Sequence, residues 1–150
     1  MTDLRLDDRL AIQALNDEFG HRLDHGDLDG FVDLFTEDVR YANGARQLNG
    51  QKEMRAFFAA RAAGDRVSRH LYSGLRIAFE GVDRASGTSV WLTFAGSGPL
   101  PIRPADPFAV ADVSDRYFRT PDRGWRIAVR QIAPVMLSDT VPELPSRSSS

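Results

Sequence analysis

The stretch that decides the fold is RLAIQALNDEFGHRLD, Arg9–Asp24. Its apolar side chains recur at the three- and four-residue spacing of an amphipathic helix, namely Ile12, Leu15, Phe19 and Leu23. On the flank of this stripe, a second set lies four residues apart: Asn16, Gly20 and Asp24. Because a glycine inside a helix costs about 1 kcal/mol relative to alanine, Gly20 predicts the close approach of another element. The flank therefore predicts a helix whose last turn faces a pocket.

Composition narrows the class of protein. The chain has 150 residues, 42% apolar and 27% charged, which is typical of one soluble domain with a real core. The net charge is −2 with both signs mixed along the chain, so no nucleic-acid partner is expected. There are no cysteines, which excludes disulfides and a thiol nucleophile. With no apolar run of membrane-spanning length (about 20 residues), we expect a cytoplasmic protein without a membrane partner.

Two further helices are predicted. After a stop at His25-Gly26, Asp27 is a plausible N-cap for a helix from Leu28 to about Thr36. The segment 39–43 is a short strand candidate. Asn49-Gly50 is a turn signal, and Asn49 is expected to cap a third helix that fades at Gly64.

The rest of the chain reads as β-structure. The expected strands are 67–79, 89–95, 108–119 and 124–133. They are separated by a turn region at 81–87, a proline-rich loop at 96–107 and a short hairpin turn. We expect one domain over residues 1–137 and a tail over 138–150. Helices first and antiparallel strands last indicate an α+β fold with the helices on one face of the sheet.

Several motifs in this order resemble the SnoaL-like branch of the NTF2-like superfamily, nearest to scytalone dehydratase-like proteins. They are AIQALNDEFGHRLDHGDLDGFVDLFTEDV, Asn49-Gly50, Arg69-His70, and Tyr117 followed by Gly124-Trp125-Arg126-Ile127. The resemblance covers roughly Leu4 to Leu137. It implies a cone: a curved antiparallel or mixed sheet wrapped around about three N-terminal helices, with a pocket at the open end. It also implies a homo-oligomer, a dimer or trimer, associating through the sheet.

The same resemblance implies a catalytic dyad. Members of this branch use an Asp at the end of helix one and a His opening the first long strand, and Asp24 and His70 match these positions. Arg130 matches a basic pocket residue and Tyr41 a pocket aromatic. Phe19 replaces a polar residue of catalytic members, and Gly74 replaces an Asn common four residues after the His.

Elementary chemistry gives the dyad a role and leaves alternatives open. A neutral histidine accepts a proton near pH 7, and a carboxylate on its other nitrogen fixes the tautomer. The alternative is that Asp24 lies in a solvated turn and His70 is structural. Strand parity predicts Arg126 and Arg130 on the face opposite Ile127 and Val129. There Arg130 either stabilises an oxyanion or pairs with Asp115.

Substrate-binding candidates are mainly aromatic. Tyr41 and Tyr72 are potential hydrogen-bond donors, and Phe19, Phe57 and Trp91 are potential pocket walls, although buried aromatics are commonly plain core. His21, Asp24 and His25 lack a second cluster, so no metal is expected. We predict a cofactor-independent lyase (dehydratase-like elimination) or isomerase acting on a small cyclic or aromatic hydroxylated compound. The alternative is a non-catalytic ligand-binding or assembly module, with a small apolar or aromatic ligand as partner in either case.

Overall fold

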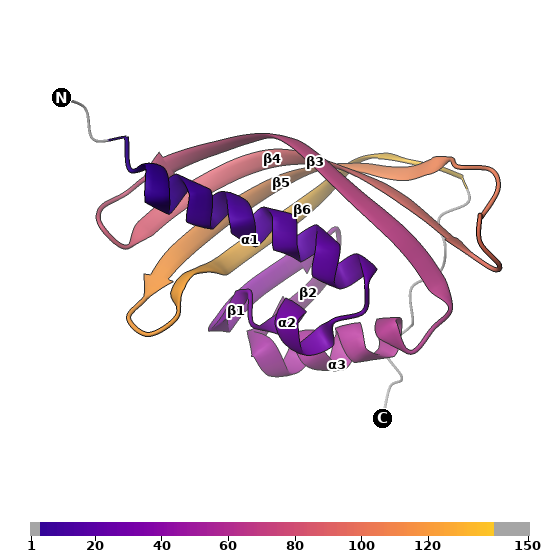
Figure 1. Ribbon diagram of the computed structural model, residues 1–150, viewed down its shortest axis with the longest axis horizontal. Helices are drawn as coiled ribbons and strands as arrows, with labels where there is room; N and C mark the ends of the chain where they lie inside the picture. The colour runs from indigo at the N-terminus through magenta and orange to yellow at the C-terminus, as the bar shows by residue number, and fades with distance from the viewer. Residues whose placement is uncertain (1–3, 140–150) are drawn as a thin grey trace.

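A computed structural model describes residues 4–139 and gives three helices and six strands within that range (Figure 1). The elements in chain order are α1 (Leu6–Asp24), α2 (Leu28–Val32), β1 (Phe35–Asn43), β2 (Arg46–Asn49), α3 (Gly50–Ala62), β3 (Arg66–Phe79), β4 (Arg84–Ser97), β5 (Pro107–Thr120) and β6 (Gly124–Leu137). The strands form one sheet in the order β2-β1-β6-β5-β4-β3. All neighbours are antiparallel except β1 and β6, which are parallel.

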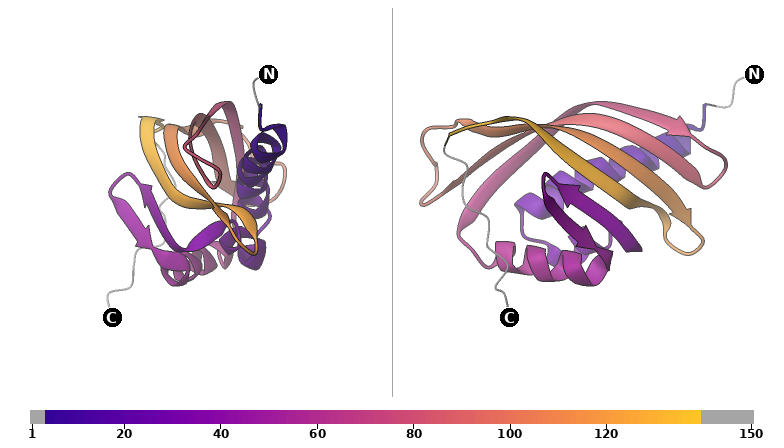
Figure 2. Two further views of the ribbon diagram at one scale, coloured as in Figure 1. Left: turned by 90° about the vertical axis from the view of Figure 1, so that its left-hand side faces the viewer. Right: turned by 180° about the vertical axis from the view of Figure 1, so that it is seen from behind.

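The sheet is open, strongly curved and covered by helices on one side. Figure 1 shows α1 crossing the concave face of the long strands, and Figure 2 shows the same helix behind the sheet when viewed from the other side. The helices α2 and α3 pack beside each other, with α3 against β1. The α+β prediction and the expected cone of a mixed sheet around about three helices are confirmed.

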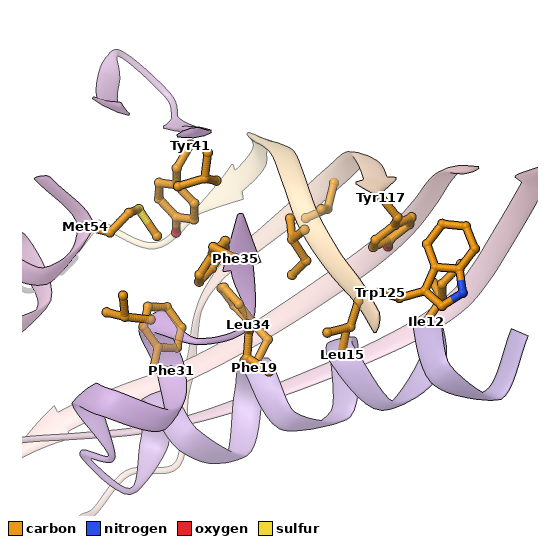
Figure 3. Packing of buried hydrophobic residues seen from close by; sticks show 14 of the residues in the cluster. Ile12, Leu15, Phe19, Phe31, Leu34, Phe35, Tyr41, Met54, Tyr117 and Trp125 are labelled. Atoms are coloured by element: carbon orange, nitrogen blue, oxygen red, sulfur yellow. The ribbon is translucent and has the colours of Figure 1, made fainter. Parts of the chain in front are cut away.

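The core lies between α1 and the sheet (Figure 3). The predicted stripe of α1 is buried there through Ile12, Leu15 and Phe19. The Phe19 ring packs against Phe31 at 5.2 Å and against Trp91 at 5.3 Å, centroid to centroid. Aromatic contacts of this kind dominate core energetics, and they fix the face that α1 presents to the sheet.

The second helix is shorter than predicted. It ends at Val32 rather than near Thr36, and β1 begins at Phe35 instead of residue 39. Phe35 continues the helical spacing, but strand pairing decides its conformation, because it lies opposite Ile127 of β6 and is fully buried. The N-cap prediction for Asp27 is confirmed, because its carboxylate accepts the Gly30 N–H at 3.0 Å.

The start of α3 differs in detail from the prediction. The residues before it form β2, which the sequence did not suggest, and Asn49 makes no side-chain cap. Instead the Asn49 N–H donates to the Glu53 carboxylate at 2.5 Å, which satisfies a backbone donor at the start of the helix.

The last four strands are longer than expected. The strand β4 begins at Arg84, inside the predicted turn region, and the loop to β5 narrows to residues 98–106. The strand predicted at 124–133 continues through Pro134 to Leu137, which ends β6; residues 140–150 of the predicted tail lie outside the described range. Pro134 is tolerated because the β5–β6 register shifts beside it, and bulges accept residues that cannot donate to the ladder.

A second bulge in β6 overturns the parity prediction for Arg130. The register passes from Tyr117 opposite Ile127 to Arg116 opposite Val129, which leaves Ala128 unpaired. One extra residue reverses the inward and outward alternation. Ile127 and Arg130 are therefore both fully buried, on the same side of the sheet.

Candidate active site

Asp24 and His70 meet at the junction of α1 and β3. The Asp24 Oδ1 atom lies 2.5 Å from His70 Nδ1, and Oδ2 accepts the His70 backbone N–H at 2.8 Å. The Ser68 hydroxyl donates to Oδ1 at 2.8 Å. Asp24 is the last residue of α1, where the helix dipole disfavours an anion, and these donors compensate for that unfavourable position.

Asp24 stays ionised in this setting. Burial alone would raise the pKa of its carboxyl, but the hydrogen bonds from His70 and Ser68 and the charge of His70 outweigh burial. They hold the pKa below its ordinary value. An anion on Nδ1 fixes the His70 tautomer, so that Nε2 carries the lone pair. Among the described residues, Nε2 of His70 has no hydrogen-bond partner.

His70 lines a cavity of about 280 Å³ inside the curved sheet. Five other predicted site residues also line it: Phe19, Tyr41, Phe57, Trp91 and Arg130. Tyr72 does not, because its ring stacks on Trp91 at 4.8 Å and its hydroxyl donates to Asp17. Asp24 lines an adjoining cavity of about 200 Å³, which shares Arg61 and Arg66 with the first.

Arg130 belongs to a buried polar cluster. Its Nε and Nη2 atoms donate to the two oxygens of Asp115 at 2.8 and 2.7 Å, and Nη2 also donates to Asn16 Oδ1 at 2.5 Å. The Tyr117 hydroxyl donates to Asp115 at 2.7 Å. Burial would lower the pKa of Arg130, but the adjacent Asp115 charge outweighs burial and raises it. The structure therefore contains the Asp115 pair that the sequence left open.

One nitrogen of Arg130 remains free to act on a ligand. Its Nη1 is buried without a hydrogen-bond partner among the described residues. The guanidinium lies 4.4 Å from the Phe19 ring centroid and 5.4 Å from that of Trp91, both cavity walls. An unsatisfied buried donor costs about 1–3 kcal/mol, so this N–H is a ready site for an acceptor in the cavity. The ion pair with Asp115 leaves the oxyanion role available.

Tyr41 lies next to this group. It pairs with Arg130 across the parallel β1–β6 ladder, and it is 5% exposed. Burial raises the pKa of its hydroxyl, against the opposing charge of Arg130. Tyr41 therefore stays protonated at neutral pH, as a hydrogen-bond donor must.

Sequence reasoning missed Ser68, Asn16 and Tyr117 as supporting residues. Asn16 had a signal, since it shares the flank of α1 with Gly20 and Asp24. The roles of Ser68 and Tyr117 depend on side chains of α1, because Ser68 donates to Asp24 and the Tyr117 hydroxyl accepts from Asn16, and the sequence does not show these contacts. Gly74, which replaces an Asn common in the resembling family, lies at a register shift of β3 with a φ of +67° and open space around it.

Gly20 gives the first testable prediction. A Cβ built there meets His70 and Trp91 at 3.5–3.6 Å, an ordinary contact. We expect Gly20→Ala to raise the free energy of unfolding by up to about 1 kcal/mol through helix propensity. Gly20→Leu should lower it by about 1–3 kcal/mol through overpacking. Urea unfolding of both variants tests this, and an alanine variant less stable than the parent would contradict it.

Within residues 4–139, no group of three or more Asp, Glu or His side chains is placed to hold a metal ion. No helix in the described range is both long and apolar enough to span a membrane.

The fold is similar to that of several solved structures. An NTF2-like protein with a cystatin-like fold from Novosphingobium aromaticivorans is 25% identical, with 93% of this chain and 94% of that chain covered and a TM-score of 0.73. A candidate scytalone dehydratase from the same organism is 20% identical, with 100% and 99% covered and a TM-score of 0.81. A hexachlorocyclohexane dehydrochlorinase is 15% identical, with 97% of each chain covered and a TM-score of 0.77.

The fold is thus that of the NTF2-like proteins, shared with scytalone dehydratase-like structures. The model of the SnoaL-like domain matches residues 4–131, so the chain belongs to the SnoaL-like domain family. The predicted family is therefore confirmed. A search of curated proteins finds no match.

Proposed function

We propose that the protein is a cofactor-independent lyase, or an isomerase using the same proton transfer, for a small cyclic hydroxylated compound. The carrying observation is the 2.5 Å contact between Asp24 and His70, with the His70 ring in the wall of an apolar cavity. A paired carboxylate and imidazole beside a pocket is a general-base arrangement. The family places this chain on a fold shared with dehydratase-like and dehydrochlorinase structures.

The proposed step is an elimination of water. His70 Nε2 accepts a proton from the carbon beside a substrate carbonyl, and the freed electron pair forms the carbon–carbon double bond. The bond to the β-hydroxyl breaks, and His70 returns its proton to the departing hydroxide to give water. Asp24 holds the imidazole in the required tautomer and stabilises its cation. No oxidation state changes overall, so the step needs no electron acceptor.

Arg130 and Tyr41 act on the carbonyl oxygen of the substrate. The unpartnered Nη1 of Arg130 donates to the carbonyl oxygen as negative charge develops there, and Tyr41 supports it. The side chain of Arg130 is held on its other edge by Asp115 and Asn16. Its position is therefore fixed before substrate binds, which is the condition for effective electrostatic stabilisation.

Cavity size and lining favour a ring. A cavity of about 150 Å³ accommodates benzene, so a cavity of about 280 Å³ suits one or two rings. Its walls include Phe19, Phe57 and Trp91. The competing function is a non-catalytic ligand-binding or assembly module. Phe19 favours it, since an aromatic wall there adds no proton donor or acceptor to the cavity.

A paired assay separates the two functions. A panel of β-hydroxy ring ketones is incubated with the protein and with His70→Gln, and products are followed by NMR while binding is followed by calorimetry. An enzyme should lose turnover by about 10²–10⁴-fold in His70→Gln and keep ligand affinity within a few fold. Equal ligand affinity in both proteins with no product from either would reject the lyase and leave the binding module.

A further inference from the structure

The cavity is unusually rich in positive charge. Four arginines line it, Arg46, Arg61, Arg66 and Arg130, and no Asp or Glu of the described residues does. Arg130 is neutralised by Asp115, and Arg46 packs its guanidinium on the Phe57 ring at 4.4 Å. Arg61 and Arg66 have no such pairing: within residues 4–139, no carboxylate lies within ion-pair distance of either.

Arg61 and Arg66 come from adjoining elements. Arg61 lies in the last turn of α3, and Arg66 opens β3 a few residues later. Both are half-buried, and both line the main cavity and the adjoining one. Residues deeper in the main cavity, such as Trp91 at 4% exposure, are nearly inaccessible. The two arginines therefore form the outer part of the site, between solvent and the apolar interior.

The partly buried position of the Arg66 guanidinium is energetically unfavourable. Its Nε is buried without a hydrogen-bond partner, and its guanidinium lies 5.1 Å from the Phe108 ring centroid. Burial and the neighbouring Arg61 charge lower the pKa of Arg66 to about 10, so it is still charged at neutral pH. Two like charges that are partly desolvated and unpaired destabilise each other. A bound anion would remove this cost.

The nearest carboxylates are already engaged. Asp24 is bonded to His70 and Ser68, and Arg61 reaches it only through the Ser68 hydroxyl, at 3.2 Å. Asp27 caps α2. Within residues 4–139, neither carboxylate forms an ion pair with the two arginines, and the charge of Asp24 offsets theirs only from a distance.

We propose that Arg61 and Arg66 bind a carboxylate carried by the ring compound that occupies the cavity. Arginine matches a carboxylate through paired N–H donors, and a ring between this carboxylate and Arg130 would lie against the aromatic walls. The inference rests on the proposed function in taking the cavity as the substrate site. It adds a substrate class, the ring carboxylic acids, and assigns Arg61 and Arg66 as specificity-determining residues.

The test compares naphthoate with naphthamide, an uncharged compound of nearly the same shape, by calorimetry on the full chain. Naphthoate should bind at least about tenfold more tightly, the equivalent of one charge-assisted hydrogen bond. Arg66→Gln and Arg61→Gln should each weaken naphthoate by about tenfold and leave naphthamide within about twofold. Added salt should weaken only naphthoate.

A matched control is Arg69→Gln, on the same strand as Arg66 but exposed; naphthoate affinity should be unchanged. Thermal unfolding of Arg66→Gln should show no loss of stability, because an unpaired, partly buried charge is removed. Equal affinities for the two compounds, no binding of either at millimolar concentration, or displacement of naphthoate by inorganic phosphate at equal concentration would each overturn the proposal. Repeating the comparison in His70→Gln separates the two proposals, since charge preference does not need turnover.

Discussion

Replacing Asp115 by alanine is expected to lower the free energy of unfolding by about 3–5 kcal/mol, the cost of leaving a buried charge without its partner. Asp115 and Arg130 both have side chains that are 0% exposed, joined at 2.7 Å. Without Asp115, Asn16 is the one acceptor that the Arg130 guanidinium keeps within residues 4–139, and the Tyr117 hydroxyl loses the oxygen to which it donates. Urea unfolding followed by tryptophan fluorescence measures the change.

Asp112→Ala is the matched control. Asp112 lies on the same strand but is exposed, so its removal should change the unfolding free energy by less than about 0.5 kcal/mol. The double variant Asp115→Leu/Arg130→Met should recover much of the lost free energy of unfolding. An apolar pair of similar volume often stabilises a protein as much as a buried ion pair does, or more. If Asp115→Ala were as mild as Asp112→Ala, the pair would not be the stabilising element described here.

Replacing Asp24 by asparagine is expected to lower turnover by about 10²–10⁴-fold, as for other losses of positioned acid–base catalysis. An amide is uncharged, and it can place an N–H where the carboxylate accepts from His70 Nδ1. The imidazole then takes the other tautomer, with its proton on Nε2 where the base must be empty. Single-turnover kinetics on a substrate found in the screen measures the loss. Asp7→Asn, exposed in the first turn of the same helix, should leave turnover unchanged.

Asp24→Asn is also expected to change how the stability of the protein depends on pH. The folded pKa of Asp24 is depressed below its unfolded value of about 3.9. Its contribution to stability is therefore fully present above that value and is lost as pH falls through the folded pKa. The stability difference between the parent and Asp24→Asn should shrink as pH falls below about pH 4. A difference that grew on acidification below about pH 4 would contradict the depressed pKa of Asp24.

Much of the architecture could be predicted because it depends on local pattern. The α1 stripe, the Asp27 cap and the placement of Asp24 opposite His70 follow from helical spacing and from the family resemblance. The orientation of Arg130 could not be predicted, because it depends on an unpaired residue, Ala128, that has no marker in the sequence. The true end of α2 was similarly hidden, since Phe35 suits either a helix or a strand until β6 lies beside it.

The anion-binding residues were hidden for another reason. Charges spaced as Arg61 and Arg66 are, on a helix end and the next strand, look like ordinary surface residues in the sequence. Their significance depends on what they lack, a carboxylate within reach, and only the assembled cavity reveals that.

The parallel pairing of β1 with β6 has a consequence for how the molecule forms. Tyr41 and Arg130 are paired in the folded sheet, although more than half of the chain lies between them in the sequence. Closing the long loop between them lowers the entropy of the chain before the new contacts stabilise the pair. Proteins with such topologies therefore fold slowly. During synthesis β1 has β2 as a strand partner but lacks its other strand partner until β6 has emerged. The binding site is therefore the last part of the protein to form. In an incomplete chain, the aromatic walls of the site are exposed to solvent.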